Sequence, residues 1–317
     1  MANEIRPQVV VSACLEFEPV RYNGQVMPSP IVRDLQPHVE YITVCPEHEI
    51  GLGVPRDPIR IVREQGKEWL LQPRTGQDVT KKMDSFTDAF LETLPPVDGF
   101  IFKSGSPTIG LHNIRVYAGA DSPAVVDKTS GFFARKIMKR YHGYPMEEDD
   151  RLRNNRIRHH FLTKLFTFAA FRQATENDDL PGFHERNRLL FAAYDPSAAA
   201  QLDGNMDAAR YRDGMKHVLS RPPTTENIMR MAGQILDALA PELTSAERAF
   251  VNEQIHAYGA NRLSEQGLFV LLRSILIRQG HPLRMQTLFA PYPSDLLPPA
   301  EQYRDHDYWK NGAFTYG

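Results

Sequence analysis

The spacing of apolar residues divides the chain into two halves. In the first half, three short runs of β-branched or aromatic residues end in turn-prone or polar residues, which predicts buried strands over residues 8–14, 40–45 and 97–103. Apolar residues at three- and four-residue spacing predict amphipathic helices over residues 78–94 and 129–141. Strands that alternate with helices indicate an α/β fold with a doubly wound, mostly parallel, Rossmann-like sheet.

After about residue 145, helical periodicity replaces the strand pattern. It predicts helices over residues 161–174, 183–194, 206–219, 225–239, 245–258 and 263–279. Thr244, followed three residues later by Glu247, has the spacing of a capping box, which marks the start of a helix. We therefore expect an α/β domain over residues 1–145 and an all-α domain over residues 146–317. The second domain would end in an extended tail, rich in Pro and Tyr, over residues 291–317.

The composition is that of a globular protein. Of the 317 residues, 42% are hydrophobic and 24% charged, and the net charge of −2 argues against a disordered chain. No apolar run approaches the roughly 20 residues that cross a bilayer, and the N-terminus has no secretory signal pattern. We therefore expect a cytoplasmic protein without a membrane partner. Its two cysteines are too few for a disulfide framework or a zinc ribbon.

Charge is distributed unevenly along the chain. The net charge is −4 over residues 1–150, +4 over residues 151–221 and −2 over residues 222–317. The basic segment begins with a run of ten residues that contains Arg151, Arg153, Arg156 and Arg158 and no acid. Clustered arginines attract polyanions, which predicts a phosphate-binding surface. The alternative is a solvated helix start that the acidic residues 147–150 neutralise.

Both cysteines follow predicted strands. In open parallel sheets, ligands bind outside the carboxyl ends of the strands. Cys14 and Cys45 fall at two such ends, and the segment 103–111 follows the third strand. Thiolates placed in this way can bind a metal ion or an iron–sulfur cluster. The alternative interpretation is a pair of inert, buried thiols.

Other residues at these strand ends add candidate chemistry. Glu47, two residues after Cys45, suits a general acid or base, and equally a carboxylate that caps a loop. Ser106 offers a hydroxyl donor to a ligand, or belongs to an ordinary Ser-Pro turn. Arg56 and Arg60 are candidates for anion binding or for salt bridges. No dinucleotide-binding or P-loop glycine pattern is present.

The strand-end motifs resemble a known family. SACL…VRYNG, CPE…GLGVPR and KSGSP…G, which begin at residues 12, 45 and 103, are similar to the signature segments of the thiouracil desulfurase (TudS) family. Residues 147–152, 188–196 and 288–293 resemble the helical domain of the YbgA type. The fusion of the two domains resembles the RudS type of tRNA 4-thiouridine desulfidase.

The resemblance implies roles for individual residues. Cys14 and Cys45 match two of the three cysteines that hold a 4Fe–4S cluster in the family, whose open iron accepts sulfur from the thiolated base. Glu47 matches a catalytic carboxylate, and Ser106 matches the serine of the Ser-Pro motif. The third cysteine of the family falls on Ile109 in this chain.

Because isoleucine cannot bind iron, the nature of the cofactor stays undecided. His48, three residues after Cys45, is a candidate for the missing ligand. A mononuclear metal on the two thiolates and a third ligand is a second alternative, and a site without a cofactor is a third.

The resemblance also implies a function and a partner. It predicts a desulfidase that removes sulfur from thiolated uracil, with 4-thiouridine in tRNA as the expected substrate and the arginines at 151–158 contacting the RNA backbone. The alternative is a cluster-free relative that binds tRNA or a nucleotide and has lost activity because Ile109 replaces a cluster cysteine. A hydrolase with a mononuclear metal in the same cleft is a further option. We expect no obligate protein partner.

Overall fold

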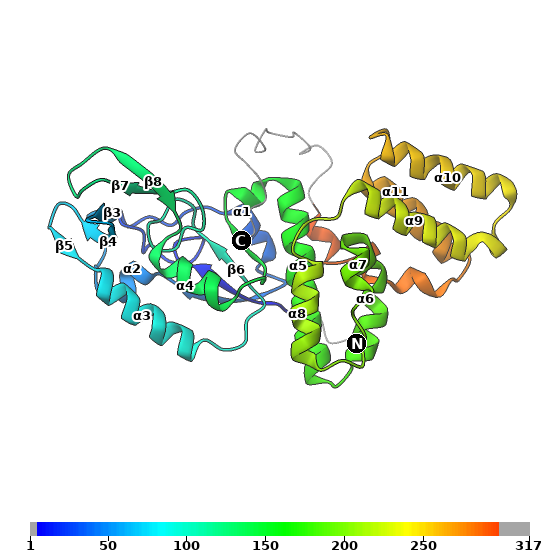
Figure 1. Ribbon diagram of the computed structural model, residues 1–317, viewed down its shortest axis with the longest axis horizontal. Coiled ribbons are helices and arrows are strands. Elements are labelled where there is room, and N and C mark those ends of the chain that lie inside the picture. Colours follow the sequence, from blue (N-terminus) through cyan, green and yellow to red (C-terminus); the bar gives the residue numbers. More distant parts are fainter. Residues whose placement is uncertain (1–4, 298–317) are drawn as a thin grey trace. The chain divides into compact units, whose positions relative to one another are not determined.

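A parallel sheet forms the centre of the first part of the chain (Figure 1). In the computed structural model, which describes residues 5–297, β1 (Gln8–Ser12) lies between β2 (Glu40–Val44) and β6 (Gly99–Phe102). The short strand β9 (Met146–Glu148) adds to the other edge of β6. All three pairings are parallel, so the predicted α/β fold with a mostly parallel sheet is confirmed.

Helices cover both faces of this sheet. Val10 and Phe100, which are register partners, point toward α3 (Thr80–Thr93) and α4 (Phe132–Arg140) and share one apolar core with them. On the opposite face, α5 (Asn155–Glu176) places Leu165 against the backbone of Gly99. The strands β1 and β6 are buried on both faces, which explains their continuous apolar runs, whereas β2 at the edge is partly exposed.

A second sheet was not predicted. Its strand order is β5-β4-β3-β7-β8, and the strands are β3 (Arg60–Glu64), β4 (Lys67–Gln72), β5 (Gln77–Asp78), β7 (Ile114–Tyr117) and β8 (Val125–Thr129). The hairpin between β3 and β4 turns at Gln65 and Gly66, both with positive φ, as a two-residue hairpin turn requires. These strands are half polar because one face lies against the core and the other meets solvent.

The chain divides into two compact units, and the division falls within α5. The first unit comprises residues 5–169 with 295–297, and the second comprises residues 170–294. The domain boundary that the sequence predicts, between residues 145 and 146, stays a prediction. The strand β9, which directly follows that point, pairs with β6, and the first unit continues to residue 169.

The second unit is helical, as predicted. Its helices are α6 (Leu180–Tyr194), α7 (Pro196–Ala199), α8 (Ala208–Val218), α9 (Thr225–Leu239), α10 (Ser245–Gly259) and α11 (Glu265–Arg278). The capping box of Thr244 and Glu247 is confirmed at the start of α10. A second threonine, Thr224, caps the start of α9. The buried Tyr211 ring stacks on Phe171, with centroids 5.8 Å apart.

Short helical turns complete the described chain. They are α1 (Pro30–Leu35), α2 (Pro46–Glu49), η1 (Arg151–Arg153), η2 (Ala240–Glu242), η3 (Pro282–Met285), η4 (Thr287–Phe289) and η5 (Ser294–Leu296). Most of the predicted tail, residues 298–317, lies outside the described residues. Among the helices that are described, none combines the length and apolarity needed to span a membrane.

Two glycines give opposite predictions for stability. A Cβ on Gly131, at the start of α4, would overlap the backbone carbonyl of Thr108, so Gly131→Ala is expected to cost about 1–3 kcal/mol of unfolding free energy. Gly233, within α9, has open space at its Cβ position, and Gly233→Ala is expected to stabilise by up to about 1 kcal/mol. Chemical denaturation measures both. A neutral Gly131→Ala would contradict the close packing of α4 against the 103–111 segment.

Candidate active site

The carboxyl ends of β1, β2 and β6 open into one pocket. Its volume is about 240 Å³, and its walls come from residues 12–14, 20–22, 44–47, 56, 58–59 and 103–109. These include all three segments that the strand-end rule selected. Drug-sized ligands occupy pockets of about 300–1,000 Å³, so this pocket suits a smaller molecule, such as a single nucleobase.

Two uncharged thiols line this pocket. Cys14 follows β1, and Cys45 directly precedes α2, where it occupies the N-cap position. Both are free and half-buried. Burial raises the pKa of Cys14 to about 11, and the neighbouring Cys45 adds to the shift. Burial also raises the pKa of Cys45 above its usual value. At neutral pH, both side chains are therefore thiols, which are weaker nucleophiles and metal ligands than thiolates.

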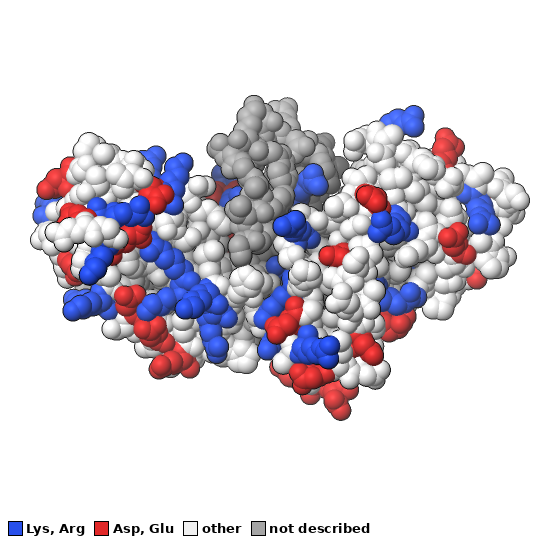
Figure 2. Space-filling model, in the orientation of Figure 1, with Lys and Arg blue, Asp and Glu red and all other residues white. Residues whose placement is uncertain are grey.

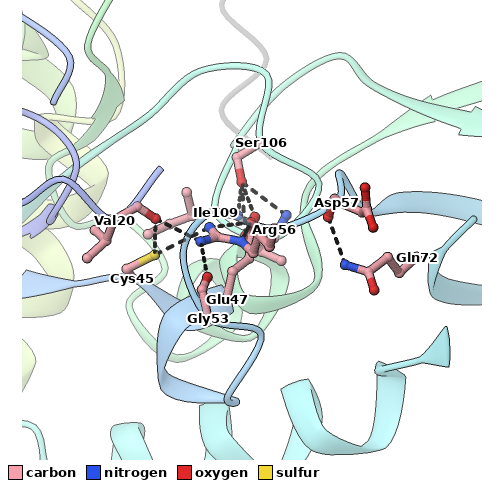
Figure 3. A network of polar contacts seen from close by, with 10 residues as sticks. Val20, Cys45, Glu47, Gly53, Arg56, Asp57, Gln72, Ser106 and Ile109 are labelled. Carbon is pink, nitrogen blue, oxygen red and sulfur yellow. Dashed lines mark hydrogen bonds and ion pairs between the residues drawn. The ribbon is translucent and has the colours of Figure 1, made fainter. Parts of the chain in front are cut away.

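The guanidinium of Arg56 holds the carboxylate of Glu47 (Figure 3). Its Nη2 and Nε lie 2.7 and 3.0 Å from Oε2 of Glu47. Its Nη1 donates to the carbonyl oxygens of Val20 and Gly53, at 2.9 and 3.1 Å, and its Nη2 lies 3.8 Å from Sγ of Cys45. The Arg56 side chain is only 3% exposed. One buried cation therefore joins the start of α2 to the loops that contain Val20 and Gly53.

The second oxygen of Glu47 faces two hydroxyl groups. Oε1 accepts from Oγ1 of Thr108 at 2.9 Å and from Oγ of Ser106 at 3.4 Å. The two hydroxyls lie 2.9 Å apart, and Oγ of Ser106 also accepts the backbone N–H of Ile109 at 3.2 Å. This arrangement gives the carboxylate a hydrogen-bonded route along which a proton can move.

Acidic residues at the end of β9 hold the 103–111 segment in place. Asp149 accepts from the backbone N–H of Ser104 at 3.0 Å and from Nζ of Lys103 at 3.1 Å. Glu148 accepts from the backbone N–H groups of Leu111 and His112, at 2.7 and 3.2 Å. Both acids are buried, and burial raises the pKa of Glu148 to about 7. The acidic run therefore positions the site loop.

The structure brings most of the candidate residues together. Cys14, Cys45, Glu47, Ser106 and Ile109 all line the pocket. Arg56 also lines the pocket, but Arg60 does not. The Arg60 guanidinium lies over the Tyr117 ring and donates to the carbonyl oxygens of a loop. His48 is exposed on α2 and is not among the lining residues.

Reasoning from the sequence assigned no role at the site to Thr108, Lys103, Glu148 at the end of β9 or Asp149 directly after it. Thr108 directly follows the Ser-Pro pair, and this position could have indicated that its hydroxyl lies at the site. The acids carried no local signal, because their role depends on the pairing of β9 with β6.

The arginines at 151–158 do not form one exposed surface. Nε of Arg151 lies 2.7 Å from Oε1 of Glu147. Arg158 is largely buried, pairs with Asp34 at 3.3 Å and donates to a backbone carbonyl. Arg153 and Arg156 are exposed.

Basic side chains instead gather over α4 on the face shown in Figure 2. The last turn of this helix carries Lys139 and Arg140, both exposed.

The residues at the pocket do not fit a 4Fe–4S cluster held by three cysteines. Position 109 is a buried isoleucine, 4% exposed, which has no donor atom for iron. Within residues 5–297, no group of three or more His, Cys, Asp or Glu side chains has an arrangement that could hold a metal ion. Such clusters are normally held by cysteine thiolates, so we derive no chemical step through a cluster.

Comparisons with known proteins found similarities for both parts of the chain. Residues 9–149 match the family described as 2-thiouracil desulfurase, and residues 196–293 match a family of proteins of unknown function, DUF1722. The resemblance of the sequence to the thiouracil desulfurases, an enzyme family, and to a helical domain of the YbgA type is thereby confirmed.

Individual relatives match the first part of the chain. The uncharacterised protein YbbK of Bacillus subtilis (strain 168) is 29% identical over 112 residues, which cover 32% of this chain and 72% of YbbK. A solved structure of the 4Fe-4S-dependent thiouracil desulfidase TudS is 26% identical, with a TM-score of 0.35, and the match covers 46% of this chain and 93% of TudS.

Removal of Arg56 should destabilise the first unit strongly. In Arg56→Met, Glu47 keeps its charge in a mostly buried place without its cation, a change that typically costs about 3–5 kcal/mol. Arg74→Met is the matched control, because Arg74 also pairs with a carboxylate, that of Asp57, but is 82% exposed, and its loss should cost under about 1 kcal/mol. Urea denaturation measures the difference. Equal effects would contradict the central role of Arg56.

Titration of Cys14 should show its raised pKa. In Cys45→Ala, Cys14 is the only thiol, and its alkylation rate by iodoacetamide should rise up to pH 10 without a plateau, since only the thiolate reacts. In denaturant, the alkylation rate of the same variant should level off with pH once the pH exceeds the ordinary pKa of a thiol. A plateau below pH 9 in the folded protein would contradict burial of the thiol.

Proposed function

We propose that the first unit removes sulfur from a thiolated uracil base and that the natural substrate is 4-thiouridine in tRNA. The observation that carries this proposal is the convergence of the Glu47 carboxylate, the hydroxyls of Ser106 and Thr108 and two thiols on one small pocket. The match of residues 9–149 to the 2-thiouracil desulfurases supports it.

The overall reaction exchanges a C=S bond for a C=O bond. Water adds to the thiocarbonyl carbon, and the C–S bond breaks, so that uracil and hydrogen sulfide form without an oxidant or reductant. The water must lose two protons and the departing sulfur must gain them. We assign this proton transfer to Glu47, which Arg56 keeps in place and which shares Oε1 with two hydroxyls.

The thiols have a supporting role in this scheme. As neutral S–H groups, Cys14 and Cys45 can donate weak hydrogen bonds to the sulfur as it gains negative charge. The apolar side chain of Ile109 contributes to a wall that suits an uncharged, flat base.

Exposed cations support tRNA as the partner. Arg153 and Arg156 lie at the surface near the start of α5, and Lys139 and Arg140 add to the basic region over α4. Phosphate contacts from such side chains give salt-dependent binding. We place this reaction in the cytoplasm, where tRNA is found.

The test is the loss of 4-thiouridine from tRNA, measured by nucleoside mass spectrometry together with the sulfide released. Glu47→Gln should reduce the rate by about 10²–10⁴-fold, as expected for a general acid–base residue. Glu49→Gln, two residues further on the exposed side of α2, is the control and should retain the rate. No turnover by the unmodified protein would overturn the proposal.

A second candidate function is binding of tRNA without turnover, and Ile109 favours it. Salt-sensitive tRNA binding with unchanged thiolation would support this function. Iron, sulfide and zinc contents of anaerobically prepared protein complete the test. If Ile109→Cys gains iron, sulfide and activity together, the cluster route implied by the resemblance has been lost through this position.

A further inference from the structure

A glutamate in an unfavourable backbone conformation lies two residues after Cys14. Glu16 has a φ of +71°, in the left-handed region that residues with long side chains rarely adopt. Such a conformation persists only where the surrounding contacts hold it, and it is found most often at functional sites. The proposed reaction assigns no role to Glu16, so its contacts require another explanation.

The carboxylate of Glu16 makes the contacts that hold this conformation. Its Oε1 accepts the backbone N–H of Ser29. Nη2 of Arg33 lies 3.0 Å from Oε1 and 3.1 Å from Oε2, and Nε lies 3.2 Å from Oε2. The Arg33 side chain is 60% exposed, whereas that of Glu16 is 17% exposed. Because water screens the exposed arginine, the hydrogen bond to Ser29 is the stronger constraint.

This hydrogen bond ties the two ends of one loop together. Ser29 is buried and directly precedes α1, and its own side chain makes no capping hydrogen bond. A buried N–H group without an acceptor is costly, and Glu16, thirteen residues earlier, supplies the acceptor. The segment from Cys14 to Ser29, which we call the 14–29 loop, is therefore closed at its base by a side chain.

Main-chain hydrogen bonds connect the base of the loop to Cys14. The N–H of Met27 donates to the carbonyl oxygen of Cys14 at 2.7 Å, and the N–H of Glu16 donates to that of Met27 at 3.1 Å. Leu15, between them, is fully buried and bridges to Met27. The thiol of Cys14 lines the pocket. A change at Glu16 therefore acts on the backbone of Cys14, while Glu47 lies on a different segment.

We propose that Glu16 is a positioning residue of the pocket. Its carboxylate keeps the base of the 14–29 loop closed and so holds the Cys14 thiol in the pocket wall. Arg56 fixes the middle of the same loop, because it donates to the carbonyl oxygens of Val20 and Tyr22. The inference rests on the proposed function only where it concerns sulfur removal.

Replacement by glycine separates the side chain of Glu16 from its backbone. Glu16→Gly removes the carboxylate and adopts a positive φ without strain. In the Cys45→Ala background, alkylation of Cys14 by iodoacetamide at one fixed pH should become about tenfold faster, because a hydrogen bond to a charged group is lost. Hydrogen exchange of the 14–29 loop should accelerate by about the same factor.

Two further variants make the test independent of one substitution. Glu16→Gln keeps an oxygen that can accept from Ser29 and should retain both rates within about threefold. Glu16→Asn also tolerates a positive φ but is one methylene shorter, so it should accelerate both rates as the glycine variant does. A glutamine variant that accelerates as much as the glycine variant would overturn the inference.

Gln65→Gly is the matched control. Gln65 also has a positive φ, of 50°, but it lies in the hairpin between β3 and β4 and does not line the pocket. Its replacement should leave the alkylation of Cys14 unchanged. An unchanged alkylation rate in Glu16→Gly and Glu16→Asn, or an equal acceleration in Gln65→Gly, would contradict a positioning role.

This role and the desulfidase can fail separately. If the unmodified protein releases no sulfide, the desulfidase is overturned, and alkylation and hydrogen exchange still decide the role of Glu16. If it does release sulfide, Glu16→Gly should lower kcat/KM by about tenfold, because Cys14 no longer faces the departing sulfur in a fixed position. Unchanged kcat/KM in this variant leaves the desulfidase standing and overturns the role of Glu16.

Discussion

The buried guanidinium of Arg56 is the interaction on which the site depends. An unpaired charge in such a place is costly, and the fold satisfies this one with the carboxylate of Glu47 and the carbonyl oxygens of Val20 and Gly53. Glu47 and Val20 belong to two different segments of the pocket wall, and Gly53 lies in the loop that leads to Arg56. The position of the carboxylate, the path of the 20–24 loop and the surroundings of Cys45 therefore follow from a single side chain.

Charge is arranged in two zones around the pocket. Inside, Glu47 is matched by Arg56 and Lys103 by Asp149, while the thiols are protonated and Ile109 is apolar. At the mouth, Arg21 keeps an unmatched positive charge among the described residues. A neutral interior suits an uncharged base, and a cationic rim attracts anions.

The sequence was sufficient for the elements whose pattern is local. Continuous apolar runs predicted β1, β2 and β6, and the strand-end rule then selected Cys14, Cys45, Glu47 and Ser106, which the structure places in one pocket. The second sheet escaped because its half-polar strands resemble loops. The roles of Glu148, Asp149 and Arg158 depend on partners far along the chain, so no local pattern reveals them.

The hydrogen bonds from Arg56 to main-chain carbonyl oxygens have a consequence for substitutions in the neighbouring loop. Contacts to Val20, Gly53 and the backbone of Tyr22 do not depend on the side chains at those positions. Substitution at residues 21 and 22 therefore leaves the contacts that hold Arg56, and through it Glu47, unchanged.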